Sequence, residues 1–170
     1  MRITDDDMKS LLRALQQTLS LEIPITEHLG ITVEGYDGEC LTLTAPLEQN
    51  VNHKKTAFGG SLNTLLTLAG WGLLWLLLKE HDIEAEIVIQ ESVVSYLLPV
   101  TRDFSARCRQ PGPSVIAAFE NTLRKKGKAR LELYSEICEA GAVATAFKGR
   151  YVALLHQRVH TEQDWGKNSQ

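Results

Sequence analysis

The sequence predicts an α+β fold in which an antiparallel sheet wraps around one long apolar helix. Residues 59–78 predict the helix, because they are rich in leucine and contain no charged side chain. A helix that is apolar on every side has no face for water, so other elements must enclose it. Segments with strand-like alternation stand close together around it, without the strand–helix–strand rhythm of a parallel sheet.

The elements before this helix are a first helix and a hairpin. Thr4 is a good helix-capping residue, and Asp7 three positions later is the partner expected in a capping box. Apolar residues then recur on one helical face, namely Met8, Leu11, Leu12, Leu15 and Leu19. They predict an amphipathic helix laid on the domain. Residues 31–33 and 41–44 alternate as strands, and Asp37-Gly38 between them predicts the hairpin turn.

One long strand is expected directly after the central helix. Residues 84–100 alternate in polarity, and Pro99 ends the run. The predicted faces are Ile87, Ile89, Glu91, Val93, Ser95 and Leu97 on one side, and Val88, Gln90, Ser92, Val94, Tyr96 and Leu98 on the other. The loop before the central helix, residues 46–58, has no hydrophobic period, and loops of that length in compact domains are often functional.

The remaining chain predicts strands at residues 104–108, 131–137 and 143–155 and a helix at residues 113–126. No repeat or linker divides the sequence, so we expect one domain over residues 1–156 and a flexible tail over residues 157–170.

Composition excludes several classes of protein. A chain of 170 residues with 44% hydrophobic and 23% charged residues is typical of one globular domain. A net charge of −3 gives no electrostatic reason to bind nucleic acid or an anionic membrane. Cys40, Cys108 and Cys138 are odd in number and have no metal-ligand spacing, which predicts reduced cytoplasmic thiols and no metal site. The acidic N-terminus does not resemble a secretory signal.

The apolar helix is long enough to raise the question of a membrane span. Residues 59–78 would cover about 30 Å at about 1.5 Å per residue. However, its first half carries four polar side chains, those of Ser61, Asn63, Thr64 and Thr67. We therefore expect a buried core helix and no membrane span.

A glycine pair, Gly59-Gly60, stands at the start of this helix. Glycine lets a ligand approach bare backbone, where the first N–H groups and the positive end of the helix dipole favour a polarised oxygen. The alternative is that the pair only allows the helix to pack tightly against the sheet, and both can hold at once.

An antiparallel sheet around one central helix is the hotdog architecture, and the chain resembles hotdog-fold acyl-CoA thioesterases. It is most similar to the thioesterase domain of the YiiD C-terminal type, over residues 23–156. Members show Asn, then H-G-G six residues on, then a carboxylate seven residues past the second Gly. This sequence has Asn52, then Phe58-Gly59-Gly60, then Thr67. The aromatic-x-x-Pro strand end and the Asp that follows it are matched by residues 96–99 and Asp103.

The resemblance implies hydrolysis of an acyl thioester carried by coenzyme A or an acyl-carrier protein, without a further cofactor. It implies that the Gly60 N–H polarises the thioester carbonyl and that the site spans the interface of a homodimer or a dimer of dimers. Phe58 replaces the family's His, and Thr67 replaces its carboxylate. Thr67 could hold the attacking water, or its hydroxyl could bond back to the helix.

Other side chains are candidates for the remaining roles. Asn52 could orient water or the carbonyl, or only close its own turn. His53 could act as a base, or be a solvated loop residue. Glu91 could be a base if burial among Ile87, Ile89 and Val93 raised its pKa, or it could lie near an exposed edge or at a bulge. The residues expected to bind substrate are Phe58, Gly59, Ser61, Asn63 and Tyr96.

A basic segment at residues 124–130 has three interpretations. It matches R-x-x-G-x-A, a pyrophosphate-loop pattern of acetyltransferases, but that pattern must open a helix and the residues after it alternate as a strand. It could contact the phosphates of coenzyme A, or be a solvated turn.

The sequence as a whole favours a thioesterase. The competing prediction is a non-catalytic domain that binds or senses acyl-CoA, with an acetyltransferase as its partner.

Overall fold

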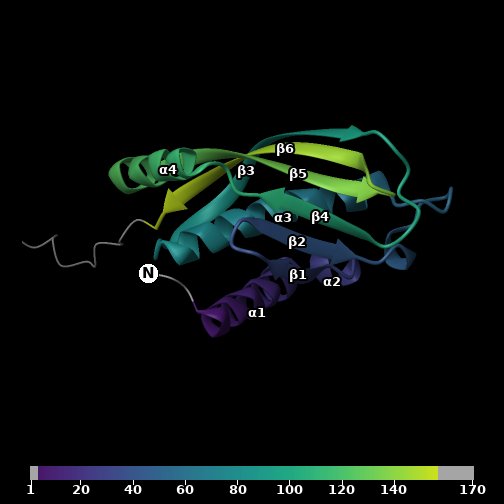
Figure 1. Ribbon diagram of the computed structural model, residues 1–170, viewed down its shortest axis with the longest axis horizontal. Helices are drawn as coiled ribbons and strands as arrows, with labels where there is room; N and C mark the ends of the chain where they lie inside the picture. Colours follow the sequence, from purple (N-terminus) through teal and green to yellow (C-terminus); the bar gives the residue numbers. More distant parts are fainter. Residues whose placement is uncertain (1–3, 157–170) are drawn as a thin grey trace, which may run out of the picture.

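A six-stranded antiparallel sheet curves around a central helix in the computed structural model, which describes residues 4–156 (Figure 1). The strand order is β1-β2-β4-β5-β6-β3, so β1 and β3 form the two edges. This is the predicted α+β hotdog architecture. The predicted tail at residues 157–170 lies outside the described residues.

The elements follow the predicted order. The helices are α1 (Asp5–Glu22), α2 (Ile25–His28), the 3₁₀ turn η1 (Glu48–Asn50), α3 (Gly59–Glu80) and α4 (Pro113–Lys126). The strands are β1 (Thr32–Tyr36), β2 (Cys40–Ala45), β3 (Ala85–Tyr96), β4 (Phe104–Arg109), β5 (Lys128–Glu139) and β6 (Ala142–Leu155).

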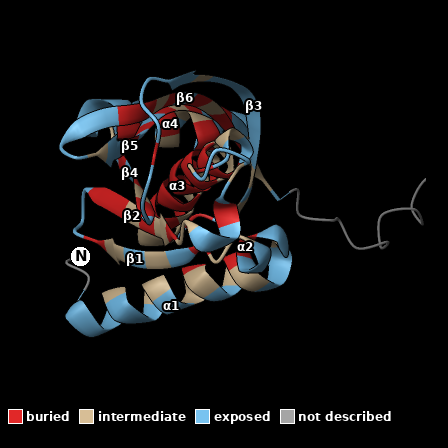
Figure 2. Ribbon diagram, turned by 90° about the vertical axis from the view of Figure 1, so that its right-hand side faces the viewer, coloured by how far each residue is buried: buried red, intermediate tan, exposed pale blue. Residues whose placement is uncertain are grey.

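The central helix α3 forms the middle of the core. Its leucines at positions 65, 66, 73, 74 and 76 have no exposed surface. Figure 2 shows the helix as an almost continuously buried rod with the sheet around it. Among the described helices it alone has the length and hydropathy to cross a membrane, but 72% of its most apolar window is buried in the fold. Its apolar side chains are therefore used to form the core.

Local signals account for the ends of the N-terminal elements. The Asp7 N–H donates to Thr4 Oγ1 over 3.2 Å, and the Thr4 N–H donates to the Asp7 carboxylate over 3.2 Å, which completes the predicted capping box. In the hairpin, Asp37 Oδ1 accepts the backbone N–H groups of Glu39 and Cys40, while Gly38 has a φ of 91°. That φ is the conformation for which the turn needs glycine.

The alternation of inward-facing and outward-facing side chains along β3 reverses in the middle of the strand. The register with β6 shifts there, so that Ile89 lies opposite Tyr151 whereas Glu91 lies opposite Arg150. Tyr151 points inward, since its hydroxyl donates to the Thr67 carbonyl oxygen of α3 over 2.7 Å. Paired residues share a face, so Glu91 lies on the outer face with Arg150. The single face predicted for residues 87–97 is therefore wrong, because a β-bulge inserts one residue.

Helix α4 closes the end of the core near the C-terminus of α3. Ile116, Phe119 and Leu123 are its buried residues. Gly127, with a φ of 70°, ends the helix, and β5 begins at the next residue. The R-x-x-G-x-A segment therefore ends a helix and leads into a strand, the reverse of a pyrophosphate loop.

Candidate active site

A tight turn leads the chain into α3. Val51 and Ala57 form an isolated antiparallel bridge, and the Asn52 N–H donates to the Thr56 carbonyl over 2.8 Å. Beyond the bridge, the Phe58 N–H donates to the Asn50 carbonyl over 2.7 Å. These bonds fix the chain direction at the first residue of α3, so the start of the helix has a defined position.

The N-terminus of α3 has no side-chain cap. Its N-cap residue is Phe58, which carries no hydrogen-bond acceptor, and the first intrahelical bond runs from the Leu62 N–H to the Phe58 carbonyl. The N–H groups of Gly59, Gly60 and Ser61 therefore precede the first bond of the helix ladder. Together with the helix dipole they form a positively polarised end.

Two aromatic rings flank the glycine pair. A Cβ placed on Gly60 would lie 2.4 Å from Phe58 Cε1, and one placed on Gly59 would lie 3.4 Å from Tyr96 Cε1. The Tyr96 hydroxyl also donates to the Gly59 carbonyl over 3.1 Å. Both rings are more than half exposed. The structure thus brings Phe58, Gly59, Gly60 and Tyr96 together at the start of α3.

A cavity of about 360 Å³ opens beside this helix start. It is lined by Ala57, Gly59, Leu62 and the segment Tyr96 to Val100. Apart from the Tyr96 hydroxyl, the side chains in this lining are apolar. A cavity of this size and chemistry suits an acyl or aryl group.

Two further predicted residues lie along α3. Asn63 and Thr67 are four residues apart and share a helical face. Asn63 Oδ1 is buried and has no hydrogen-bond partner within residues 4–156. It is Thr64, rather than Thr67, whose hydroxyl bonds back to the helix, to the Gly60 carbonyl over 2.9 Å. Ser61 is buried in the first turn.

The polar atoms of Asn52 are used by its own turn. Its Oδ1 accepts the N–H groups of Lys54 and Thr56, and its Nδ2 donates to Thr56 Oγ1 over 2.9 Å. His53 lies at the exposed tip of the same turn. In this arrangement Asn52 shapes the turn, and within residues 4–156 no hydrogen bond joins either side chain to the Gly60 N–H.

Glu91 lies away from these residues. Its side chain is 60% exposed on the outer face of the sheet, and its carboxylate accepts from Arg150 Nη1 over 2.8 Å. Arg150 also bonds Glu132 of β5 over 2.9 Å, so the three side chains form a ladder across the strands. Of the two alternatives for Glu91, burial is therefore wrong, and the structure shows the exposed position at a bulge.

This position leads to a first prediction. Replacing the carboxylate in Glu91→Gln keeps the shape of the side chain and removes only the charge that faces Arg150. Because an exposed ion pair contributes about 0–1 kcal/mol, stability should change little. Thioester turnover should also be unchanged, and steady-state kinetics of the purified variant checks this. A strong loss of kcat would show that Glu91 does reach the substrate.

Three anchoring residues lay outside the sequence-based predictions for the site. Asn50 is buried, and its Nδ2 donates to the carbonyls of Leu29 and Pro46. Asp103, known only as a motif match, accepts the Leu47 N–H over 2.8 Å. Glu139 accepts the Thr101 hydroxyl over 2.6 Å, next to the segment that lines the cavity. Their partners are distant in sequence, so no local pattern identified them.

Glu139 gives a prediction for acid stability. The Thr101 hydroxyl lowers the pKa of the Glu139 carboxyl below its usual value of 4.5. A carboxyl with a lowered folded-state pKa stabilises the fold above its unfolded pKa, and this contribution is lost as pH falls through the folded value. The stability difference between wild type and Glu139→Gln should hold above about pH 5 and shrink below it. Urea unfolding across pH measures this; a difference that persists into strong acid would contradict the assignment.

Comparison with known proteins shows the family of the chain and agrees with its fold. The family described as "Putative thioesterase (yiiD_Cterm)" matches residues 12–155. The chain belongs to this thioesterase family. A putative thioesterase from Shewanella oneidensis is 31% identical, with a TM-score of 0.79 over 86% of this chain and 99% of its own.

Two further solved structures extend the comparison. A protein of unknown function from Chlorobaculum tepidum is 35% identical and has a TM-score of 0.84, covering 87% of this chain and 96% of its own. A probable thioesterase from Pseudomonas aeruginosa is 20% identical, with a TM-score of 0.72 over 85% of this chain and 95% of its own, and shows the fold alone. The family's substrate is not given by these names.

Proposed function

We propose that this protein hydrolyses acyl-CoA thioesters in the cytoplasm, at the N-terminus of α3. The observation that carries the proposal is the uncapped helix start at Gly59-Gly60 beside an apolar cavity. A thioester there would place its acyl group in the cavity and its carbonyl oxygen at the Gly60 N–H. Backbone donors fixed at this point stabilise the oxyanion that forms when water attacks.

The attacking water is held from α3. Asn63 and Thr67 lie on one face of the helix, and the buried Asn63 Oδ1 can accept a hydrogen bond from water. The water oxygen bonds to the carbonyl carbon, the C–S bond breaks, and the thiol of coenzyme A leaves with a proton. The products are a carboxylic acid and free coenzyme A.

His53 accepts the proton of this water. Within residues 51–70, which form the turn and the first three turns of α3, it is the only histidine, and histidine is the side chain that most often serves as a general base. Its exposed position at the tip of the turn requires that the turn bend toward the helix, or that it serve the site of a second subunit.

The prediction for His53 includes a rescue experiment. His53→Ala should lower kcat by about 10²-fold with little change in stability, because the residue is exposed. Added imidazole should restore part of the rate, since an exposed tip leaves room for it. Lys54→Ala, the neighbouring exposed substitution, is the matched control. Unchanged kcat in His53→Ala would remove this residue from the mechanism.

The enzyme acts as a homodimer in this proposal. Strand β3 is a twelve-residue edge strand, and its exposed apolar residues include Val88, Val93 and Tyr96. Edges of this length and composition are normally covered. A second copy related by two-fold symmetry covers the edge by antiparallel pairing of β3 with β3, which places the two Tyr96 ends apart and each near the start of the other strand.

A non-catalytic acyl-CoA-binding domain is the second candidate, in which an acetyltransferase could be the partner. Two observations favour it: Asn52 is occupied by its own turn, and none of the residues lining the cavity is a carboxylate. The same helix start and cavity would then hold the thioester without hydrolysis.

Release of free thiol from a panel of acyl-CoA thioesters separates the two candidates. Short, long and aryl acyl groups are incubated with the purified protein, and acyl-CoA binding is measured in parallel by calorimetry. Turnover that depends on acyl chain length supports the enzyme. Tight binding without release would overturn hydrolysis and leave the binding domain.

A further inference from the structure

A second cavity lies far from the helix start, between α4 and β5. It has a volume of about 530 Å³, and Val115, Ala118 and Thr122 of α4 face Leu131 of β5 across it. Strand β5 pairs with β4 only over residues 135–137, so among residues 4–156 its first half has no strand neighbour on the side of α4. The groove therefore runs along an open strand edge, with a mostly apolar floor.

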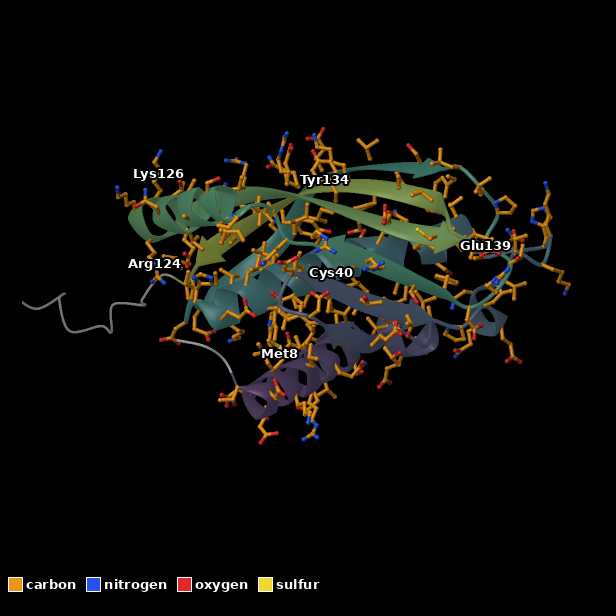
Figure 3. All side chains as sticks on the ribbon, in the orientation of Figure 1. Met8, Cys40, Arg124, Lys126, Tyr134 and Glu139 are labelled. Carbon is orange, nitrogen blue, oxygen red and sulfur yellow. The ribbon has the colours of Figure 1, made fainter. Side chains whose placement is uncertain are left out.

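Four exposed cations lie in the segment where α4 turns into β5, and one of them, Arg130, lines the cavity. Ala118, Thr122 and Lys126 are spaced four residues apart, so Lys126 continues the groove face of the helix, and Lys125 lies beside it. Lys128 and Arg130 follow on the outer face of β5. Figure 3 shows Lys126 projecting to the same side of the molecule as Tyr134, while Arg124 projects to the other.

These cations have no acidic partners. Within residues 4–156, no ion pair involves Lys125, Lys126, Lys128 or Arg130. Arg130 donates only to the neutral Gln90 amide over 2.9 Å. Favourable contact with the C-terminal dipole explains cations in the last turn of α4, but Lys128 and Arg130 lie beyond the helix. The groove thus combines an apolar floor with a positive end whose charges form no ion pair within the part of the chain that the structure describes.

We propose that this groove binds the adenosine-phosphate end of coenzyme A. The flat base fits the apolar floor, and the cations contact the phosphates as charge-assisted donors. The Thr122 hydroxyl donates to the Ala118 carbonyl over 2.8 Å, so toward the base it acts as a hydrogen-bond acceptor. Glu132 also lines the groove, but its charge is balanced by Arg150 and Lys148. This inference rests on the proposed function and assigns its substrate as a coenzyme A thioester.

The proposed dimer brings the groove within reach of a site. Lys128 pairs with Leu154, and Ala85 pairs with Leu155, so the starts of β5 and β3 flank the end of β6. When the whole of β3 pairs with a second copy, Ala85 lies opposite the partner's Tyr96. The backbone at Lys128 of one subunit and the backbone at the partner's Tyr96 are then separated by three strand spacings, about 15 Å. The extended pantetheine arm spans a distance of this order, so each groove serves the site of the other subunit.

The test compares two substrates that differ only in the nucleotide. Lys126→Glu with Lys128→Glu should raise KM for an acyl-CoA about tenfold or more, because two contacts to phosphate become repulsive. KM for the matching acyl-pantetheine, and kcat for both, should not change. Lys9→Glu with Arg13→Glu on the exposed face of α1 gives the same change in charge as a control. Ala118→Trp fills the groove without altering charge and should also raise KM for acyl-CoA.

Binding of adenosine 3′,5′-bisphosphate, measured by calorimetry, separates this inference from the proposed function. Loss of this binding in the groove variants supports the groove even when no thioester is hydrolysed. Hydrolysis of acyl-CoA and acyl-pantetheine with the same KM in all variants would overturn the groove and leave the thioesterase. An effect confined to an acyl-carrier-protein substrate would also overturn it. Circular dichroism of each variant ensures that folded proteins are compared.

Discussion

Gly60→Pro is expected to lower kcat for an acyl-CoA thioester by about 10²–10³-fold, the range measured when one oxyanion-hole donor is removed. Proline lacks the backbone N–H, and residue 60 lies in the first turn of α3, where no intrahelical bond uses that N–H. The substitution therefore removes the proposed donor and leaves the helix ladder intact. Thermal unfolding should confirm that the variant folds.

Gly60→Ala is the matched control for this change. It keeps the N–H, while its Cβ would approach the Phe58 ring to 2.4 Å. That ring is 56% exposed and can turn away, so the alanine variant should keep most of its turnover. If the proline and alanine variants lost kcat equally, the shape around Phe58 would be the cause. That result would contradict a role for the Gly60 N–H.

The largest expected effect on stability belongs to Gly70→Ala. A Cβ there would lie 2.2 Å from the Tyr151 hydroxyl oxygen, and Tyr151 has no exposed surface into which it could move. The ring must shift within the core, and its hydroxyl would lose the bond to the Thr67 carbonyl. We expect the free energy of unfolding to fall by about 3 kcal/mol, from overpacking and the lost hydrogen bond.

Gly72→Ala on the same helix provides the comparison. Its Cβ would lie 2.9 Å from Leu41 Cδ2, the end of an aliphatic side chain that can adjust. Alanine also favours helix by about 1 kcal/mol, so the net change should stay within about 1 kcal/mol. Urea unfolding at one fixed protein concentration measures both variants, since dimerisation would otherwise alter the comparison. A similar fall in the free energy of unfolding for Gly70→Ala and Gly72→Ala would contradict the packing described around Tyr151.

The elements with strong local signals could be predicted from the sequence. The capping box at Thr4, the turn at Asp37-Gly38 and the helix α4 each depend on residues a few positions apart. The central helix was predictable because its composition leaves it no place except the core. The glycine pair at its start could also be recognised, since a backbone N–H site needs only glycines at a helix start.

The positions of the candidate acids and bases could not be predicted. One bulged residue reverses the face of Glu91, and the sequence left a bulge at this residue as an alternative without deciding for it. Asn52 matched a motif by spacing, but its amide is used by hydrogen bonds inside its own turn. Asn50 and Glu139 act through partners far away in the chain. Each of these outcomes depends on tertiary contacts that hydrophobic periodicity does not describe.

The central claim is that the Gly60 N–H receives the thioester carbonyl oxygen, and the amide signals of the protein test it most directly. The chain has 12 glycines, so ¹⁵N-glycine labelling gives a simple spectrum in which the Gly60→Ala variant identifies the Gly60 signal. Two ligands are compared, a non-hydrolysable acyl-CoA analogue that keeps the carbonyl and an S-alkyl-CoA that lacks it. We predict a downfield shift of the Gly60 amide proton with the carbonyl ligand alone. The same shift with both ligands, or none at Gly60, would contradict the assignment.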